Sequence, residues 1–288
     1  MRTPTCLLGG GGIRERVAHG HDPDRFVEIG SITKVFTATV LAGLVKEGTV
    51  ALDLPLEECL ASVPRGTGIT LRNLADHTSG LPRLPVVPVG PPDDPYAGFT
   101  EAALAGLLRE LDRQVTGRQG EEEYSNFGYA VLGHALTVAA GRPYQRLVDA
   151  YVLSPLGLAA GTVTARPPAG SRLVPRGMFG RARPLWDLSG PILPAGGLWS
   201  TCRTLADIVV ALLVERRLGE PALAWRRGPA TLWHNGATRG SSVVAALHDD
   251  GPWLLLHRLG GAPAETDRLA REALLAAVSS RGGDGTAP

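Results

Sequence analysis

The stretch EIGSITKVF, residues 28–36, contains Lys34, one of only two lysines in a chain that has 27 arginines. Lys34 follows Ser31 by three residues, inside an apolar segment whose pattern predicts a largely buried helix. Residues three apart share one face of a helix, so the Lys34 amine can reach the Ser31 hydroxyl. A desolvated lysine can lose its proton, whereas arginine cannot. The pair therefore predicts a serine nucleophile with a lysine base.

This spacing is a weak signal by itself. Short patterns of this kind recur by chance, and a lysine at the start of a helix can extend its amine to solvent instead. Other segments must supply the remainder of a site before Ser31 is assigned as a nucleophile.

The composition is that of a globular protein with little net charge. The 288 residues are 44% hydrophobic and 20% charged, with a net charge of +1. This length suits one large domain or two intermeshed ones. Nucleic acids and anionic membranes usually require a basic surface, so we expect neither as a partner.

The cysteines and the start of the chain bear on the cellular compartment. Cys6, Cys59 and Cys202 form no C-x-x-C pair and no local cluster with histidine. We therefore expect reduced thiols and no metal site. The first residues show no signal-peptide pattern, and no uncharged run is long enough to span a bilayer. On this basis we expect a cytoplasmic protein.

The two ends of the chain predict strands, and the middle predicts helices. Residues 5–20 read as a hairpin around a glycine-rich turn, and residues 230–260 as three strands followed by a closing helix. Among the amphipathic segments between them, one predicts a helix with Asn126 as its N-cap and Gly141 as its stop.

The order of these elements predicts an α/β (α+β) fold. We expect an antiparallel sheet flanked by helices and built from both chain ends, with an inserted, mostly helical region. The predicted boundaries are residues 1–60 plus 195–280 for the sheet region, 61–194 for the helical region and 281–288 for a disordered tail.

Two further motifs flank predicted elements. Tyr124-Ser125-Asn126 precedes a helix, and His234-Asn235-Gly236 ends a strand. Each has an ordinary explanation when taken alone. Tyr124 can be a packed aromatic, Asn126 a helix cap and His234 a core or surface histidine.

The order and spacing of the three motifs resemble the serine β-lactamase and penicillin-binding-protein superfamily. The closest resemblance is to the branch that holds class C β-lactamases, DD-peptidases and esterases. LADHTSGLP (74–82), LSPLGL (153–158) and PAGGLWSTCRTLADI (194–208) are also similar to stretches of that branch, so the resemblance covers nearly the whole chain.

The resemblance implies a role for each motif residue. Ser31 would be the acylated nucleophile, and Lys34 would share its proton network. Tyr124 would take part as general base. Asn126 would hydrogen-bond Lys34 and the substrate, and His234 would replace the strand lysine of the family.

The resemblance also places the oxyanion hole and the substrate contacts. The backbone N–H groups of Ser31 and Ala237 would bind the oxyanion. Asn235 and Gly236 would border the substrate. Arg239 would hold a substrate carboxylate or lie exposed at a strand end. Trp186 is a candidate for an apolar acyl pocket, with core packing as the alternative. No metal or organic cofactor is implied.

The implied reaction is acyl transfer through an acyl-enzyme. A histidine in place of the strand lysine leaves less fixed positive charge for a β-lactam carboxylate. We therefore expect an intracellular esterase, amidase or transacylase that takes a small-molecule acyl donor, with or without a second acceptor substrate. The Arg-, Ala- and Gly-rich composition adds the hypothesis of a role in specialised-metabolite (antibiotic) biosynthesis.

Two alternatives remain open at this point. One is a β-lactamase or a D-amino-acid peptidase. The other is a non-turnover sensor that binds a β-lactam-like ligand. The loops at 82–98 and 163–195 are expected to shape access to the acyl-enzyme. The sequence does not distinguish hydrolysis from transfer, nor does it give the oligomeric state.

Overall fold

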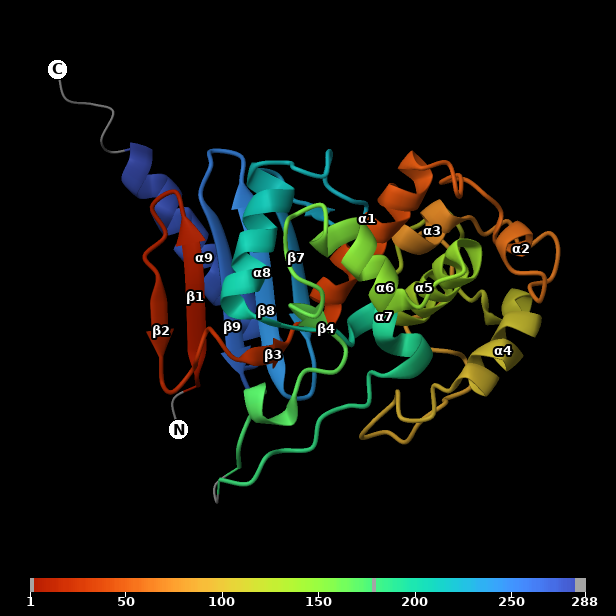
Figure 1. Ribbon diagram of the computed structural model, residues 1–288, viewed down its shortest axis with the longest axis horizontal. Coiled ribbons are helices and arrows are strands. Elements are labelled where there is room, and N and C mark those ends of the chain that lie inside the picture. Colours follow the sequence, from red (N-terminus) through yellow and green to blue (C-terminus); the bar gives the residue numbers. More distant parts are fainter. Residues whose placement is uncertain (1–2, 178–179, 283–288) are drawn as a thin grey trace.

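The computed structural model describes residues 3–177 and 180–282. Strands from both chain ends form one antiparallel sheet, which confirms the predicted fold class. The first long strand, β1, pairs with the last, β9, so strands from the two ends of the sequence lie side by side (Figure 1). The sheet order is β2-β1-β9-β8-β7-β6. The strands are β1 (Thr5–Gly10), β2 (Arg16–Ala18), β6 (Arg226–Arg227), β7 (Thr231–Ala237), β8 (Ser241–His248) and β9 (Trp253–Leu259).

Helices cover both faces of this sheet. Alternate residues of a strand point to opposite faces. On β8, Val243 and Ala245 join the main core, while Val244 and Ala246 pack with Leu274 of α9 (Pro263–Gly282). The opposite face carries α8 (Cys202–Val209) and the helical region (Figure 1). Because both faces are buried, β8 and β9 are almost continuously apolar.

A second, small sheet was not predicted. It joins β3 (Phe26–Glu28), β5 (Trp199–Thr201) and β4 (Val163–Thr164) in the order β3-β5-β4. Strands of two or three residues are too short to show an alternating pattern. This sheet matters for function because β3 leads directly into the Ser31 segment.

The helical region surrounds α1 (Thr33–Lys46), whose residues from Thr33 to Leu41 are all buried. The remaining helices are α2 (Leu56–Cys59), α3 (Leu71–Ala75), α4 (Glu101–Arg109), α5 (Asn126–Ala140), α6 (Tyr144–Val148) and α7 (Leu193–Gly196). Short 3-10 or π turns cover Gly30–Ile32, Leu111–Gln114, Asp149–Leu153, Ala169–Ser171, Gly190–Ile192 and Val210–Val214. No helix in the described ranges is long and apolar enough to cross a membrane.

Two details of the helix boundaries differ from the sequence prediction. Ser125, not Asn126, is the N-cap of α5, because its hydroxyl accepts the Gly128 N–H at 2.7 Å. Gly141 ends α5 in the left-handed conformation, as predicted. The closing helix continues through Gly282, so the predicted tail begins too early, and residues 283–288 lie outside the described part. The proposed domain boundaries stay a prediction.

Candidate active site

Ser31 lies in a 3-10 turn, Gly30–Ile32, that leads into α1. The Ser31 side chain is partly exposed, while Lys34 in the first turn of α1 is fully buried. The Lys34 Nζ lies 3.2 Å from Ser31 Oγ, and it donates to Asn126 Oδ1 at 2.7 Å and to the Ala195 carbonyl oxygen at 2.5 Å. The predicted serine–lysine pair is therefore in contact.

The surroundings of Lys34 favour a neutral amine. Burial is the main cause that holds the Lys34 pKa well below its ordinary value, and the positive charge of Arg83 adds to it. A neutral amine keeps two N–H groups and one lone pair. The oxygens of Asn126 and Ala195 only accept hydrogen bonds, whereas the Ser31 hydroxyl can donate. The lone pair therefore belongs to Ser31.

Asn126 links Lys34 to a loop that sequence reasoning did not assign to the site. The Asn126 Nδ2 donates to the Tyr96 hydroxyl oxygen at 2.8 Å. Lys34 binds the oxygen of the Asn126 amide and Tyr96 binds its nitrogen, so the orientation of the amide is fixed. Tyr96 comes from the Pro-rich loop at 82–98, where no sequence motif singled it out. Its position matches the expectation that this loop borders the site.

Tyr124 is held beside the nucleophile by aromatic and cationic neighbours. Its ring lies 4.5 Å from that of His77, and the Lys34 Nζ lies 4.8 Å from its centroid. Burial raises the Tyr124 pKa to about 12, and hydrogen bonding to the Ser31 side chain opposes that rise. The phenol is therefore protonated at neutral pH. This favours Lys34, not Tyr124, as the group that first takes the serine proton.

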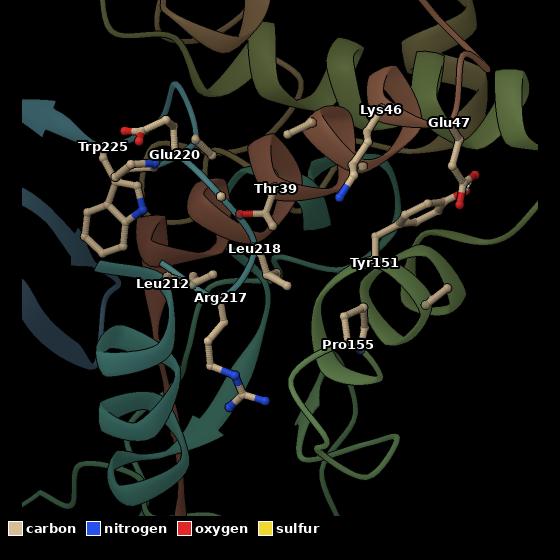
Figure 2. Close-up of a pocket in the computed structure, with 16 residues that line it drawn as sticks. Thr39, Lys46, Glu47, Tyr151, Pro155, Leu212, Arg217, Leu218, Glu220 and Trp225 are labelled. Atoms are coloured by element: carbon tan, nitrogen blue, oxygen red, sulfur yellow. Dashed lines mark hydrogen bonds between the residues drawn. The ribbon is translucent and has the colours of Figure 1, made fainter. Parts of the chain in front are cut away.

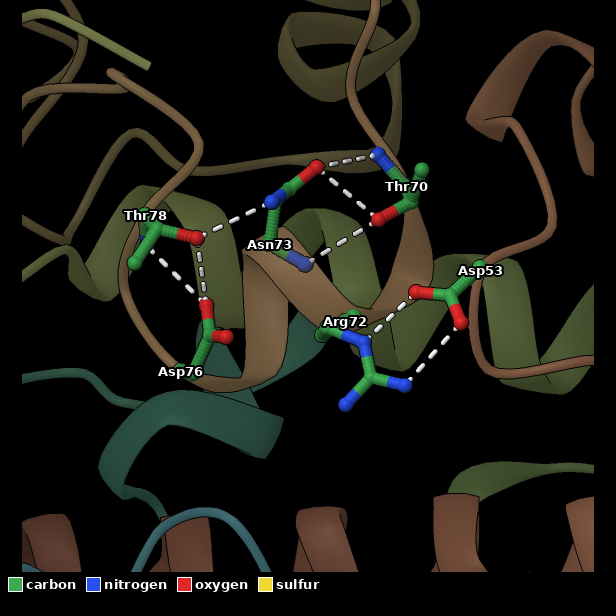
Figure 3. A network of polar contacts seen from close by, with 6 residues as sticks. All are labelled: Asp53, Thr70, Arg72, Asn73, Asp76 and Thr78. Carbon is green, nitrogen blue, oxygen red and sulfur yellow. Dashed lines mark hydrogen bonds and ion pairs between the residues drawn. The ribbon is translucent and has the colours of Figure 1, made fainter. Parts of the chain in front are cut away.

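The turn that carries His77 is braced by a polar network (Figure 3). Thr70 and Asn73 form a capping box at the start of α3, and Asn73 Nδ2 donates to Thr78 Oγ1 at 2.9 Å. Asp76 accepts from the Thr78 hydroxyl at 2.6 Å. This turn holds His77 at a positive φ of 66°.

His77 in turn fixes the backbone around Tyr124. The Nδ1 of His77 accepts the Ser125 N–H at 3.1 Å, and its carbonyl oxygen accepts the Glu123 N–H at 2.8 Å. His77 is therefore structural, and its burial lowers its pKa to about 2. Since Glu123 and Ser125 directly precede and follow Tyr124, these two hydrogen bonds fix the backbone position of Tyr124.

The end of β7 is open toward the nucleophile turn. β6 pairs only with Leu232 and Trp233, so the following residues have a free edge. The Thr238 N–H donates to the Ser241 carbonyl across the hairpin. In an antiparallel ladder the next pair, Ala237 and Ser242, therefore points its backbone groups outward. The Ala237 N–H is thus directed away from β8, as an oxyanion donor requires.

Two glycines allow this edge to approach Ser31. A Cβ on Gly236 would lie 2.4 Å from the Ile29 carbonyl oxygen and 2.9 Å from the Ser31 nitrogen. A Cβ on Gly30 would lie 2.9 Å from the Ala237 nitrogen, and Gly30 has a positive φ of 49°. The geometry brings the two predicted oxyanion donors side by side. Gly30 was not predicted as a site residue, although it directly precedes the nucleophile.

The strand motif contributes one side chain to the site and turns another away. His234 is buried and close enough to Lys34 for the lysine charge to affect it. Burial lowers the His234 pKa to about 3, and its Nδ1 lies 2.7 Å from the Asn235 carbonyl oxygen. Asn235 points to the opposite face, where its Nδ2 donates to Asp267 of α9 at 3.1 Å. The structure therefore does not place the Asn235 side chain against a substrate.

The structure places Arg239 away from the Ser31 hollow and Trp186 at its edge. Arg239, at the tip of the β7–β8 hairpin, pairs with Asp93 at 3.9 Å and is not among the residues around the Ser31 hollow. Trp186 does border that hollow, and its ring meets the Tyr96 ring edge-on at 5.6 Å. The cation that borders the hollow is Arg83, which the sequence analysis did not select.

The hollow above Ser31 is small, with a volume of about 20 Å³, and is partly open to solvent. Its walls are Ser31, Arg83, Tyr96, Asn126, Trp186, Leu188, Ile192, Ala195, Gly196 and Ala237. Two loops meet over it: the Trp186 indole donates to the Asp93 carbonyl at 3.0 Å, and the Asp187 N–H donates to Asp94 Oδ2 at 2.9 Å. These contacts form a clasp between residues 93–94 and 186–187.

A larger hollow of about 510 Å³ lies beside the other end of α1 (Figure 2). Lys46, the second lysine, borders it together with Tyr151 and Trp225. The Tyr151 hydroxyl donates to Glu47 at 2.6 Å. None of the predicted site residues borders this hollow, so the chemistry belongs to the smaller one.

Comparisons with known proteins identify the family of the chain. A sequence profile of the β-lactamase family matches residues 6–276. The chain belongs to the β-lactamase family.

Two curated relatives match part of the chain. "Putative beta-lactamase-like 1" of Homo sapiens is 36% identical over 246 residues, covering 75% of this chain and 48% of that protein. The D-alanyl-D-alanine-carboxypeptidase/endopeptidase AmpH of Escherichia coli (strain K12) is 35% identical over 156 residues, covering 52% and 40%. The chain thus spans less than half the length of these relatives.

Solved β-lactamase structures share the fold. The class C β-lactamase from Rhodobacter sphaeroides superposes with a TM-score of 0.74 at 18% identity, over 96% of this chain and 95% of that one. The β-lactamase from Sulfitobacter sp. EE-36 gives a TM-score of 0.77 at 18% identity, over 97% and 93%. At this identity the similarity concerns the fold alone.

Proposed function

We propose that this β-lactamase family member transfers an acyl group from a small-molecule ester or amide through a covalent acyl-Ser31 intermediate. The observation that carries the proposal is the fully buried Lys34 amine. Its other two partners are carbonyl oxygens that cannot donate, which leaves its lone pair for the Ser31 proton.

The proposed acylation step balances through two protein groups. Ser31 Oγ attacks the acyl carbon while its proton passes to Lys34. The carbonyl oxygen becomes an oxyanion and accepts from the N–H groups of Ser31 and Ala237. The leaving group takes its proton from the Tyr124 hydroxyl. The resulting phenolate lies beneath the Lys34 ammonium, which is 4.8 Å from the ring centroid.

Deacylation reverses these proton movements. Water, or the hydroxyl or amine of an acceptor, gives its proton to the Tyr124 phenolate as it attacks the acyl carbon. Ser31 leaves and regains its proton from Lys34. Both groups return to their starting states, so hydrolysis and transacylation differ only in the molecule that attacks.

The neutral state of His234 favours an acyl donor that places no carboxylate near the strand motif. With its pKa lowered to about 3 by burial, His234 is neutral at neutral pH. Its Nδ1 faces the acceptor-only carbonyl of Asn235, so its other nitrogen presents a lone pair. This favours an ester or a neutral amide, as the sequence suggested. The cytoplasmic location and the role in specialised-metabolite biosynthesis stay predictions.

Arg83 favours a second candidate, a β-lactamase or D-amino-acid peptidase. Its side chain is exposed, its guanidinium lies 5.3 Å from the Tyr124 ring centroid, and it borders the Ser31 hollow. A guanidinium in this position can pair with a substrate carboxylate. The E. coli relative named above is a D-alanyl-D-alanine carboxypeptidase, which has such a substrate.

One experiment separates these candidates. Wild type, Ser31→Ala, Arg83→Gln and the control Arg239→Gln are assayed on p-nitrophenyl butyrate and on a chromogenic cephalosporin, with intact mass recorded. We expect butyrate turnover that vanishes only in Ser31→Ala.

Cephalosporin turnover that falls at least about tenfold in Arg83→Gln alone would support the second candidate. A mass adduct without turnover would support the sensor. Unchanged turnover in Ser31→Ala would refute the site.

A further inference from the structure

Four potential metal ligands, which the sequence gave no reason to group, meet behind the nucleophile segment. Cys6 and His257 are directly opposite each other on β1 and β9. Cys202 is the first residue of α8, which packs on that face of the sheet, and His21 comes from the segment between β2 and β3. Because the four positions are far apart along the chain, no sequence pattern revealed them.

Three of the four side chains, Cys6, His21 and Cys202, form a compact, buried group, and His257 adjoins this group through His21. The four residues are between 0% and 7% exposed. One ligand atom from each of Cys6, His21 and Cys202 lies within 4.8 Å of the others. His21 Nε2 is 2.9 Å from His257 Nδ1 and 4.0 Å from Cys202 Sγ.

The two distances from the His21 nitrogen are close to those of a tetrahedral sulfur–nitrogen site. With metal–sulfur and metal–nitrogen bonds of about 2.3 and 2.0 Å, ligand atoms lie roughly 3.3–3.8 Å apart. The gap between the two histidines must open and the sulfur–nitrogen gap must close, each by a few tenths of an ångström. Small side-chain rotations supply both movements.

The protonation states suit a metal. Burial lowers the pKa of His21 to about 4 and that of His257 to about 3, so both rings are neutral at neutral pH. A hydrogen bond from Cys202 lowers the Cys6 pKa, and Arg203 adds to this effect. The same hydrogen bond and burial raise the Cys202 pKa, so a metal must displace the proton of that thiol. Neutral imidazoles and thiolates are the forms that bind transition metals.

The hydrogen bonds already orient one ring. His257 Nε2 lies 3.3 Å from the carbonyl oxygen of Glu28, which can only accept, so Nδ1 carries the lone pair. His21 Nε2 then donates to that lone pair.

We propose that Cys6, His21, Cys202 and His257 bind a divalent cation of the zinc class. Both thiols release their protons to solvent, and the His21 proton moves from Nε2 to Nδ1. Two thiolates and one dication then sum to zero charge, which suits a buried position. No oxidation or reduction occurs. Sulfur and nitrogen ligands favour zinc over calcium or magnesium.

The proposed ion would join four segments that are far apart in the sequence. It would tie the first strand, the segment before β3 and the start of α8 to the last strand. Glu28, whose carbonyl oxygen accepts from His257, is three residues before Ser31. Occupancy would therefore stabilise the support of the nucleophile turn, and binding to the folded state alone raises the unfolding temperature.

Metal-free, reduced full-length protein is titrated with Co²⁺ and Zn²⁺. We expect equimolar Co²⁺ to give thiolate charge-transfer absorption and tetrahedral d–d bands, and Zn²⁺ to displace it. Zn²⁺ should also raise the melting temperature and protect two thiols from a thiol reagent. Cys202→Ser and His257→Gln should weaken Co²⁺ binding by more than about 100-fold. Cys59→Ser, the third cysteine, serves as the matched control and should bind like wild type.

The wild-type titration decides the proposal even where a variant fails to fold. Absence of equimolar Co²⁺ absorption in wild type would overturn it. So would unchanged binding in Cys202→Ser, or an equal loss in Cys59→Ser. If intact mass shows that Cys6 and Cys202 form a disulfide under reducing conditions, the cluster is a covalent link and the proposal also fails. Because the readouts are spectroscopic and thermal, they are independent of the proposed acyl transfer.

Discussion

The Lys34 Nζ lies 2.5 Å from the carbonyl oxygen of Ala195, a residue 161 positions further along the chain. Ala195 belongs to α7, which packs against α1 beside Ser31. The long, flexible Lys34 side chain is thus held at its amine by another helix. Precise placement of the base is therefore a property of the fold, not of the local helix alone.

Replacement of Lys34 by arginine should abolish catalysis. Arginine keeps its charge and cannot take the Ser31 proton. We expect kcat/KM on an activated ester to fall by about 10³-fold or more. Lys46→Arg, at the other end of the same helix, is the control and should keep wild-type activity. Circular dichroism verifies folding, and appreciable activity in Lys34→Arg would exclude Lys34 as the base.

Removal of the Tyr124 hydroxyl should slow the reaction without loss of fold. In Tyr124→Phe the ring still packs on His77, but the leaving group loses its proton donor. We expect kcat to fall by about 10²–10⁴-fold. Tyr151→Phe removes a hydroxyl that binds exposed Glu47 and should leave the rate unchanged. Equal rates in Tyr124→Phe and wild type would contradict the proposed proton path.

The pH dependence should follow the lowered pKa of Lys34. Only the neutral amine accepts a proton, so kcat/KM should rise with pH until Lys34 has lost its proton. Tyr124, with a pKa of about 12, stays protonated through this range. An ester hydrolysed at equal rates from acidic to alkaline pH, after correction for the uncatalysed reaction, would be inconsistent with this base.

A methyl group at Gly236 should damage the oxyanion site. The new Cβ would lie 2.9 Å from the Ser31 nitrogen, so the strand and the nucleophile turn must separate. We expect Gly236→Ala to lower kcat by about 10²–10³-fold. Gly106→Ala in α4 meets open space and should stabilise the protein by about 0.5–1 kcal/mol. Normal kcat in Gly236→Ala would show that the donors do not need this contact.

Glu28 should make stability depend on pH. Burial raises its pKa to about 7 from an unfolded value of 4.5, and its Oε2 accepts from the Thr238 hydroxyl. The folded state therefore binds the proton more tightly. Glu28 favours folding at low pH, and this contribution is lost as pH rises from 4.5 through about 7.

Glu28→Gln should therefore be more stable than wild type in alkaline solution. The expected gain in unfolding free energy is up to about 3 kcal/mol near pH 8.5, and close to zero near pH 4. Urea unfolding at both values measures it. The exposed Glu215→Gln is the control. A variant that loses stability at the higher pH would reverse the sign of the argument.

The local motifs could be predicted from sequence, while their three-dimensional partners could not. Ser31 and Lys34 lie one helical turn apart, so their contact follows from spacing. Tyr96 and Arg83 reach the site from a Pro-rich loop with no periodicity. The alternation of a strand would have placed Asn235 opposite His234, yet the family pattern drew both into the site.

Helix caps and the cysteine cluster show the same limit. Ser125 and Asn126 are both good helix caps. Asn126 contacts Lys34, which leaves Ser125 as the N-cap, and that contact is not visible in the sequence. Cys6 and Cys202 come together through sheet pairing and helix docking, which involve long separations in sequence. Rules based on sequence spacing detect only residues that are close to one another along the chain.

The clasp over Ser31 has a kinetic consequence. Its two hydrogen bonds join exposed loop residues and are worth about 1 kcal/mol each. We therefore expect residues 93–94 and 186–187 to part easily when an acyl donor larger than the hollow of about 20 Å³ enters. If the loops close again over the acyl-enzyme, fewer water molecules reach the acyl carbon, and an acceptor bound there competes more effectively with solvent.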